Sequence, residues 1–155
     1  MSHAAWLQQA ESDLEASRVL SAARHHSQAV WFAAQAVEKA HKAILAALGL
    51  RYEERHYKHL GHNTAEIARL LPEALHEPPD PQIAEMVSTL ESSAGSSRYP
   101  APAQTTGAGV ARVVAPAARI VASRLEIENA MHLLDWCRER IARAVRAARV
   151  MKPSP

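Results

Sequence analysis

Four side chains on one face of a predicted helix are the first candidates for chemistry in this sequence. Within the apolar segment 31–48, Gln35, Glu38 and Lys42 recur at intervals of three and four residues, which places them on one helix face with Trp31. We name Trp31, Gln35, Glu38 and Lys42 the polar stripe. A large indole among charged groups favours cover by a ligand or by a second subunit. The polar stripe is therefore a candidate ligand-binding surface.

A simpler interpretation of the polar stripe is also open. Glu38 and Lys42 form an i, i+4 pair in the favourable order, which contributes about 0.2–0.5 kcal/mol to an exposed helix. Such pairs are common on solvated helix faces. Under this interpretation the stripe stabilises its own helix or pairs with another chain, and it binds no ligand.

The sequence contains nine histidines, and three of them, His56, His59 and His62, follow one another at a spacing of three. Zinc sites use histidine, but the single cysteine, Cys137, lies far along the chain and the spacing matches no standard structural site. The sequence also has no glycine-rich phosphate loop, no Gly-x-Ser-x-Gly elbow and no His-Glu-x-x-His motif. We therefore predict no metal and no cofactor, and a polar loop around these histidines.

The composition indicates that helices must position these residues. The chain has 155 residues, of which 48% are hydrophobic and 22% charged, and this suits one domain with a substantial core. We expect that domain to cover residues 1–149, with a disordered tail over 150–155. The net charge of +2 does not indicate a dedicated nucleic-acid binder. Arginines gather near the C-terminus, where we expect a solvated face.

Cysteine content and hydropathy bear on the cellular location. A single cysteine cannot form an internal disulfide, and Cys137 in its apolar helical context is expected to pack rather than to react. The first residues lack the basic and apolar regions of a signal peptide, and no stretch approaches the ~18 apolar residues of a membrane span. We predict a cytoplasmic protein that does not associate with membranes.

Local signals in the first two thirds of the chain predict four helices. The first begins near the N-terminus and carries Asp13 on its apolar face, an unusual place for a charge. The second ends at Gly49, a typical C-terminal stop signal. Asn63 with Glu66 predicts the start of the third helix, and Asp80 followed by proline predicts the start of the fourth.

The remaining third of the chain carries weaker signals. The serine-rich stretch 92–97 is expected to end the fourth helix, and the conformation of residues 101–122 is left open. Ser123 followed by Glu126 has the capping-box pattern and predicts that a last helix begins there, while Pro116 argues against a longer one. No alternation typical of strands is found. We predict an all-α protein, an antiparallel up-and-down bundle of four to five helices.

Several sequence elements resemble the HEPN domain, whose name abbreviates "higher eukaryotes and prokaryotes nucleotide-binding". The first is the block QAVEKAHKAIL at residues 35–45, which contains most of the polar stripe. The element SRYP at residues 97–100 stands at the distance expected for that family. Asp13-Leu14 and His59-Leu60 complete the resemblance, which spans roughly residues 5–146.

The resemblance implies an up-and-down bundle that forms a homodimer, with polar groups gathered in a cleft at or near the dimer interface. It adds Tyr99 to the candidate ligand-binding residues. Small prokaryotic members of the family are often encoded beside a minimal nucleotidyltransferase, with which they form a complex, commonly of toxin–antitoxin type. The expected partners are therefore a second copy of the chain, a minimal nucleotidyltransferase, and a nucleotide or RNA.

Some members of the family are metal-independent endoribonucleases that use an arginine followed four to six residues later by a histidine. The resemblance makes Arg98 a candidate for stabilising charge on the phosphorane oxygens, and His56 or His59 a candidate for removing the 2′-hydroxyl proton. However, no histidine follows Arg98 until His132. We therefore predict a HEPN-like homodimeric module that binds a nucleotide, RNA or a nucleotidyltransferase. The alternatives are an endoribonuclease and a purely structural interaction protein.

Overall fold

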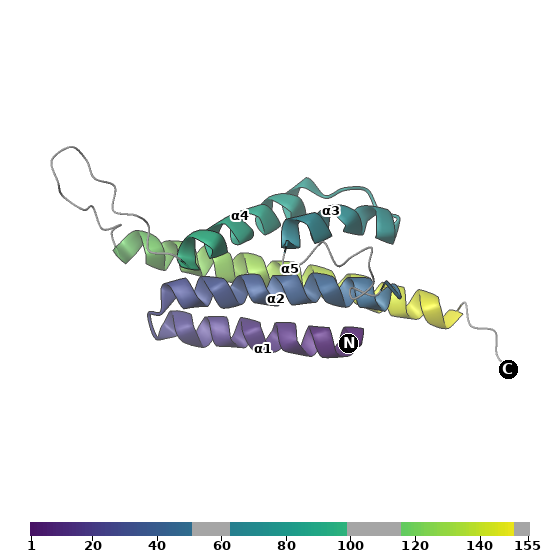
Figure 1. Ribbon diagram of the computed structural model, residues 1–155, viewed down its shortest axis with the longest axis horizontal. Coiled ribbons are helices and arrows are strands. Elements are labelled where there is room, and N and C mark those ends of the chain that lie inside the picture. The colour runs from purple at the N-terminus through teal and green to yellow at the C-terminus, as the bar shows by residue number, and fades with distance from the viewer. Residues whose placement is uncertain (51–62, 99–115, 151–155) are drawn as a thin grey trace.

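The computed structural model describes residues 1–50, 63–98 and 116–150 (Figure 1). Within these ranges the chain forms five helices and no strand: α1 (His3–Ala22), α2 (His26–Ala47), α3 (Thr64–Leu75), α4 (Pro81–Arg98) and α5 (Pro116–Val150). The four long helices α1, α2, α4 and α5 alternate in direction, and the short α3 lies beside α4 (Figure 1). The predicted all-α, up-and-down bundle is confirmed.

Local capping explains where several of these helices begin and end. Asn63 accepts a hydrogen bond from the Glu66 amide at 2.9 Å and so caps α3 as predicted. Asp80 Oδ1 accepts from the amides of the second and third residues of α4, at 3.0 and 3.2 Å. Gly49 has a positive φ of 78° just after α2, which is the conformation that a C-terminal stop requires. These three predictions are confirmed.

The ends of α4 and α5 differ from the prediction. The serine-rich stretch 92–97 stays helical, and α4 continues to Arg98. Pro116 is the first residue of α5 rather than a break in it, because proline is well suited to the first helical position, where no amide donor is needed. Ser123 and Glu126 therefore lie inside a helix of 35 residues, and the prediction that they form a capping box is wrong.

Ser123 and Glu126 instead hold helices together. Ser123 Oγ lies 3.0 Å from His26 Nδ1 at the start of α2, and Ser93 of α4 donates a hydrogen bond to the Glu126 carboxylate. Both residues are buried, and burial raises the pKa of Glu126. The two residues are one turn apart, so a single stretch of α5 is tied to both α2 and α4.

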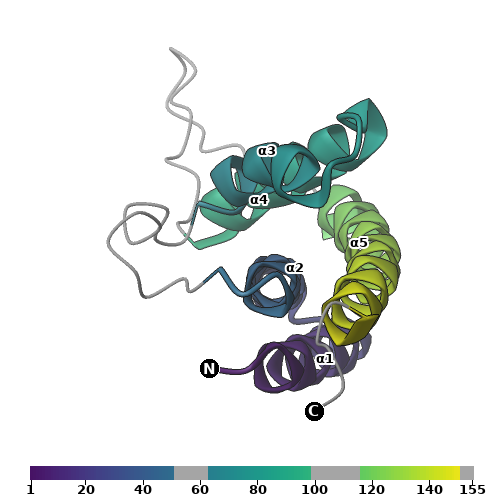
Figure 2. The same ribbon diagram turned by 90° about the vertical axis from the view of Figure 1, so that its right-hand side faces the viewer.

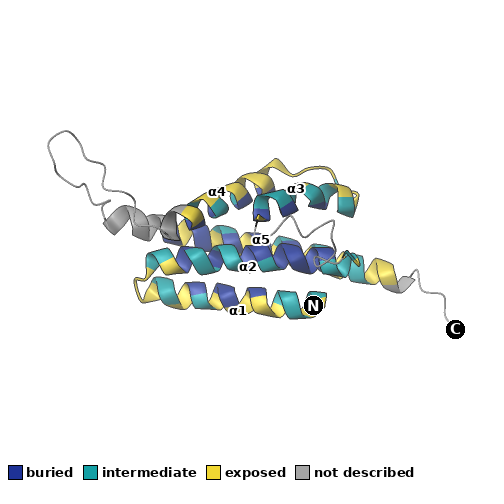
Figure 3. Cartoon of the chain, viewed as in Figure 1, coloured by how far each residue is buried: buried dark blue, intermediate teal, exposed yellow. Residues whose placement is uncertain are grey.

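Helix α2 is central to the bundle, since it packs against each of the other four helices (Figure 2). Its inward positions carry alanines that are fully buried, and such small side chains let neighbouring helices approach closely. The larger core side chains lie around them (Figure 3); those that are almost completely buried include Ile44, Leu45, Ile67, Leu71, Leu90, Leu133 and Leu134. The geometry of any site on α2 is therefore fixed by packing on several sides.

Helix α5 is the longest of the five described helices, and its C-terminal turns extend past the end of α2 (Figure 1). Several of its arginines pair with carboxylates: Arg138 with Glu11 and Asp135, and both Arg140 and Arg143 with Glu77. None of the helices within the described ranges is both long and apolar enough to cross a lipid bilayer.

Candidate functional site

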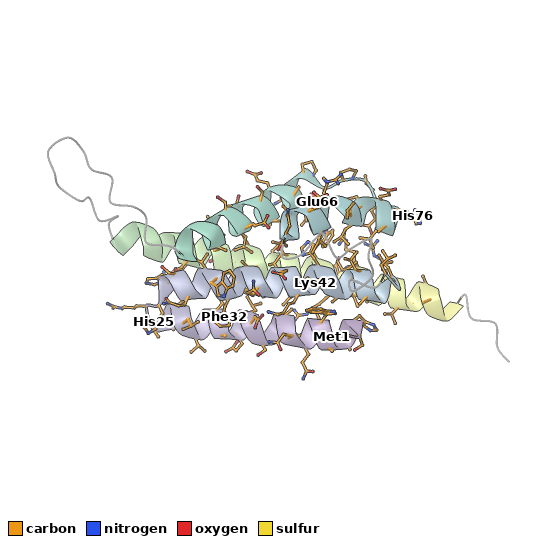
Figure 4. The ribbon with its side chains drawn as sticks, in the orientation of Figure 1. Met1, His25, Phe32, Lys42, Glu66 and His76 are labelled. Atoms are coloured by element: carbon orange, nitrogen blue, oxygen red, sulfur yellow. The ribbon has the colours of Figure 1, made fainter. Side chains whose placement is uncertain are left out.

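The charged pair of the polar stripe is buried. Only 4% of Glu38 and 3% of Lys42 is exposed, and the Lys42 ammonium donates a hydrogen bond to the Glu38 carboxylate. Lys42 also lies over the ring of Trp6 in α1, with Nζ 5.3 Å from the ring centroid. Figure 4 shows Lys42 on α2 in the middle of the bundle. The interpretation of this pair as a solvated surface ion pair is therefore wrong.

The buried pair is part of a longer polar network between α1 and α2. Gln35 donates to the other oxygen of Glu38 at 3.2 Å and accepts from Lys39 Nζ at 3.4 Å. Lys39 in turn pairs with Asp13 of α1, whose second oxygen accepts from Gln9 at 3.1 Å. This explains why a carboxylate lies on the apolar face of α1. Sequence reasoning noticed Asp13 but did not find Lys39 as its partner.

This network contains two carboxylates and two ammonium groups, so its charges balance. Each charge has lost most of its contact with water, which costs free energy that only a well-placed opposite charge can recover. Removing one member strands its partner, and in proteins this costs about 3–5 kcal/mol. The structure therefore gives each of these four charged residues a partner within the protein, and the predicted ligand-binding role of Lys42 stays a prediction.

The other members of the polar stripe line a cavity of about 170 Å³ between α2 and α4. Three of the four predicted ligand-binding residues of the stripe, Trp31, Gln35 and Glu38, contribute to its wall, whereas Lys42 does not. The remaining lining is Ala34, Val37, Thr64, Val87, Leu90, Glu91, Ala94 and Gly95. The cavity is smaller than the roughly 300–1,000 Å³ of pockets that enclose drug-sized ligands, so it suits one part of a ligand.

Glu91 gives this cavity a fixed border. Its two carboxylate oxygens accept hydrogen bonds from the amides of Thr64 and Ala65, at 3.0 and 3.3 Å, and so cap the first turn of α3. Glu91 is 27 residues from Thr64 in the chain. No local sequence signal indicates this contact, and Glu91 was not among the predicted site residues.

The remaining predicted residues fall at or beyond the limits of the described structure. Arg98 is the last residue of α4, three positions after Gly95, which is about one helical turn beyond the cavity wall. The side chain of Arg98 is outside the described part of the chain, as are Tyr99, His56 and His59. Their predicted roles stay predictions.

His41 and Cys137 form a second buried polar contact, in which neither residue is suited to catalysis. His41 Nδ1 donates to the Val37 carbonyl at 2.8 Å, and burial lowers the pKa of this histidine to about 4. Cys137 Sγ lies 3.9 Å from the same ring, and burial raises the pKa of its thiol. The expectation that Cys137 packs in the core is confirmed. Nowhere in the described ranges do three or more His, Cys, Asp or Glu side chains gather as metal ligands would.

The fold and the cavity define a class of protein: an up-and-down helical bundle whose central helix carries a buried charge network beside a small cavity lined by both apolar and polar side chains. A family model described as the HEPN domain matches residues 3–139. The chain therefore belongs to the HEPN domain family.

A solved structure shows the same fold. The crystal structure of ST0689, an archaeal HEPN homologue, superimposes with a TM-score of 0.57 and 21% sequence identity, and the match covers 91% of this chain and 98% of that chain. At this identity the similarity shows the fold alone. No curated protein matches the sequence.

Proposed function

We propose that this protein is a homodimeric HEPN-type module that binds a nucleotide, or a nucleotide unit of RNA, in the cavity between α2 and α4. The observation that carries the proposal is that Trp31, Gln35 and Glu38, selected from the sequence alone, line one cavity. An indole at the wall offers a surface on which a nucleobase can stack. An amide and a carboxylate can bond the polar edge of that base.

The charged side chains that line the cavity favour entry of the base of a nucleotide rather than entry of its phosphate. Glu38 and Glu91 both line the cavity, while no lysine or arginine among the described side chains does. Lys42 pairs with Glu38 and the first amides of α3 bind Glu91, but the remaining lone pairs of both carboxylates can accept hydrogen bonds from an exocyclic amino group, whereas they offer a phosphate no donor. Arg98, about one turn further along α4, is our candidate for the phosphate.

Isothermal titration with the four nucleoside monophosphates and with short single-stranded RNA tests this proposal. The decisive variant is Gly95→Phe, since a Cβ at Gly95 meets nothing within 4 Å and a ring there can extend into the cavity. The matched control is Ser88→Phe, which places the same ring on the exposed face of α4. We expect saturable heat for the wild type and the control, and loss of binding in Gly95→Phe. No heat from any nucleotide or RNA contradicts direct ligand binding.

The dimer and a protein partner are separate parts of the proposal. We propose that two copies associate and that a minimal nucleotidyltransferase, in a pair of toxin–antitoxin type, is the protein partner. Membership of the HEPN family supports both expectations. Light scattering coupled to size-exclusion chromatography checks the dimer, and a single monomer mass at micromolar concentration contradicts it.

An endoribonuclease is the second candidate function, and the position of Arg98 favours it. The end of α4 places the backbone of this arginine next to the cavity wall. Incubation of the protein with single-stranded RNA in EDTA tests metal-independent cleavage. We expect Arg98→Ala and His59→Ala to abolish any such cleavage, and intact RNA after incubation with the wild type rules the activity out.

A further inference from the structure

A hollow of about 580 Å³ lies where the turn between α1 and α2 meets α5. It shares no residue with the cavity between α2 and α4. The polar side chains that line it are Arg18, Ser21, Arg24, His26, Arg124 and Glu128. Figure 4 labels His25, which stands in this turn, at the end of the bundle opposite Met1. The hollow is thus formed by side chains from α1, from the turn and from α5.

Two arginines of this hollow have no carboxylate partner, unlike most arginines in the described part of the chain. Arg69, Arg138, Arg140 and Arg143 each pair with at least one carboxylate. In contrast, neither Arg24 nor Arg124 has a carboxylate partner among the residues that the structure describes, and Arg18 reaches only Glu15, at 3.4 Å and largely exposed. The lining of the hollow therefore contains three arginines and one carboxylate, that of Glu128, while Glu15 pairs with Arg18 from outside the lining. Counting Glu15, the exposed charges at the hollow sum to +1.

The backbone at this hollow is held in place by the end of α1. Arg24 has a φ of 64° because it follows the C-cap of α1, where its amide bonds the Ser21 carbonyl at 3.0 Å and the His25 amide bonds the Leu20 carbonyl at 2.8 Å. Here the hydrogen bond between His26 and Ser123, and that from Ser17 to the Ala29 carbonyl at 2.7 Å, fix the start of α2 against α5 and α1.

We propose that Arg18, Arg24 and Arg124 form an anion site that binds a phosphate group, separate from the cavity between α2 and α4. Guanidinium groups bind phosphate oxygens through paired, charge-assisted hydrogen bonds. Side chains from three segments approach the hollow from different directions, which suits a group with several oxygens better than a carboxylate. The cavity between α2 and α4 has hydrogen-bond acceptors and no described lysine or arginine in its lining, so it has the opposite preference.

Isothermal titration with sodium pyrophosphate at constant ionic strength tests the anion site. The variant is Arg24→Gly combined with Arg124→Ala, because glycine removes the charge and relieves the positive φ at the same time. Loss of two charge-assisted contacts is expected to weaken pyrophosphate binding at least about tenfold. The matched control is Arg146→Ala, an exposed arginine of α5 that also has no carboxylate partner within the described residues. It should keep the wild-type affinity.

Two further results decide the interpretation. Trp31→Ala alters the cavity between α2 and α4 but should leave pyrophosphate binding unchanged. The proposed anion site can therefore be correct even if that cavity binds no nucleotide. Equal weakening by Arg146→Ala and by the double variant would show general attraction to a basic surface and overturn the proposal. The absence of saturable heat in the wild type would overturn it as well. Circular dichroism melting of both variants confirms that they are folded.

Discussion

The side of α2 that faces α1 and the side that faces α4 use polar side chains differently. Towards α1, Lys39 pairs with Asp13 and Lys42 lies over Trp6, while a serine of α1 bonds a backbone carbonyl of α2. Every one of these polar groups meets a complementary group on the neighbouring helix. We call the side of α2 that faces α1 the closed side, because its polar groups are paired with groups of α1.

Towards α4, the same helix leaves a cavity. Gln35 and Glu38 reach its wall, and α4 lines it with Val87, Leu90, Glu91 and the small residues Ala94 and Gly95, which leave the space unfilled. The residues of α2 are polar on both sides, so the difference is set by what the partner helix offers. A polar residue on a buried helix face can therefore belong to a network of paired polar groups or to a ligand site. The side chains of the helix that packs opposite determine which of the two it is.

The strongest test of the closed side is a substitution that strands a buried charge. Lys42→Met leaves the Glu38 carboxylate buried without its ammonium partner, and we expect the free energy of unfolding to fall by about 3–5 kcal/mol in urea denaturation. The double variant Glu38→Gln/Lys42→Met should recover much of this loss. The exposed pair Glu66 and Arg69 is the control, since Glu66→Gln should cost at most about 1 kcal/mol. A loss from Lys42→Met as small as the control's contradicts the network.

A second test uses pH and the buried His41. Its pKa is lowered from 6.5 to about 4 in the folded protein, so at intermediate pH the unfolded chain binds a proton that the folded chain does not. Stability should therefore fall as pH drops from about 6.5 to about 4, by about 3 kcal/mol from this residue. Urea denaturation across this range measures the slope. In His41→Gln the slope should be shallower, and equal slopes would contradict the assignment.

A smaller effect is expected from the hydrogen bond that Ser17 donates to the Ala29 carbonyl. Ser17→Ala removes a fully buried contact between α1 and α2, and we expect a loss of about 1 kcal/mol in the free energy of unfolding. Ser12→Ala, on the exposed face of α1, is the matched control and should lie within about 0.5 kcal/mol of the wild type. No difference between the two variants would mean that this bond adds nothing to the closed side.

On the side of α2 that faces α4, which we call the open side, a substitution should raise the free energy of unfolding rather than lower it. Gly95→Ala adds a methyl group where nothing lies within 4 Å, and alanine favours a helix over glycine, so the free energy of unfolding should rise by about 0.5–1 kcal/mol. The same methyl group narrows the cavity and should weaken nucleotide binding. Thermal melting and titration measure the two effects. A destabilised Gly95→Ala would show that the side opposite α2 is already filled.

Much of the fold follows from local sequence signals. Asn63, Asp80 and Gly49 act within a few residues of their own positions, and their predicted roles are confirmed. Ser123 and Glu126 carry a pattern of the same kind, but His26 and Ser93, their partners, are distant in the chain. A local pattern cannot distinguish a helix cap from a contact between helices.

The candidate site could be predicted only in part for the same reason. Helical spacing places Trp31, Gln35 and Glu38 on one face, and the structure finds all three at one cavity. Burial of Lys42 and the position of Glu91 depend on α1 and α3, and no spacing within α2 contains that information. The family resemblance identifies the class of protein, and the cavity in the structure locates the candidate site.

Backbone and indole NMR of the ¹⁵N-labelled protein, titrated with the nucleoside monophosphates, tests the difference between the two sides of α2 most directly. We predict saturable shifts at the Trp31 indole and at the Gly95 and Glu91 amides, with the Trp6 indole and the Asp13 and Lys39 amides unchanged. Shifts at Trp6 and Asp13 without shifts at Gly95, or no saturable shift anywhere, would contradict the assignment of an open and a closed side.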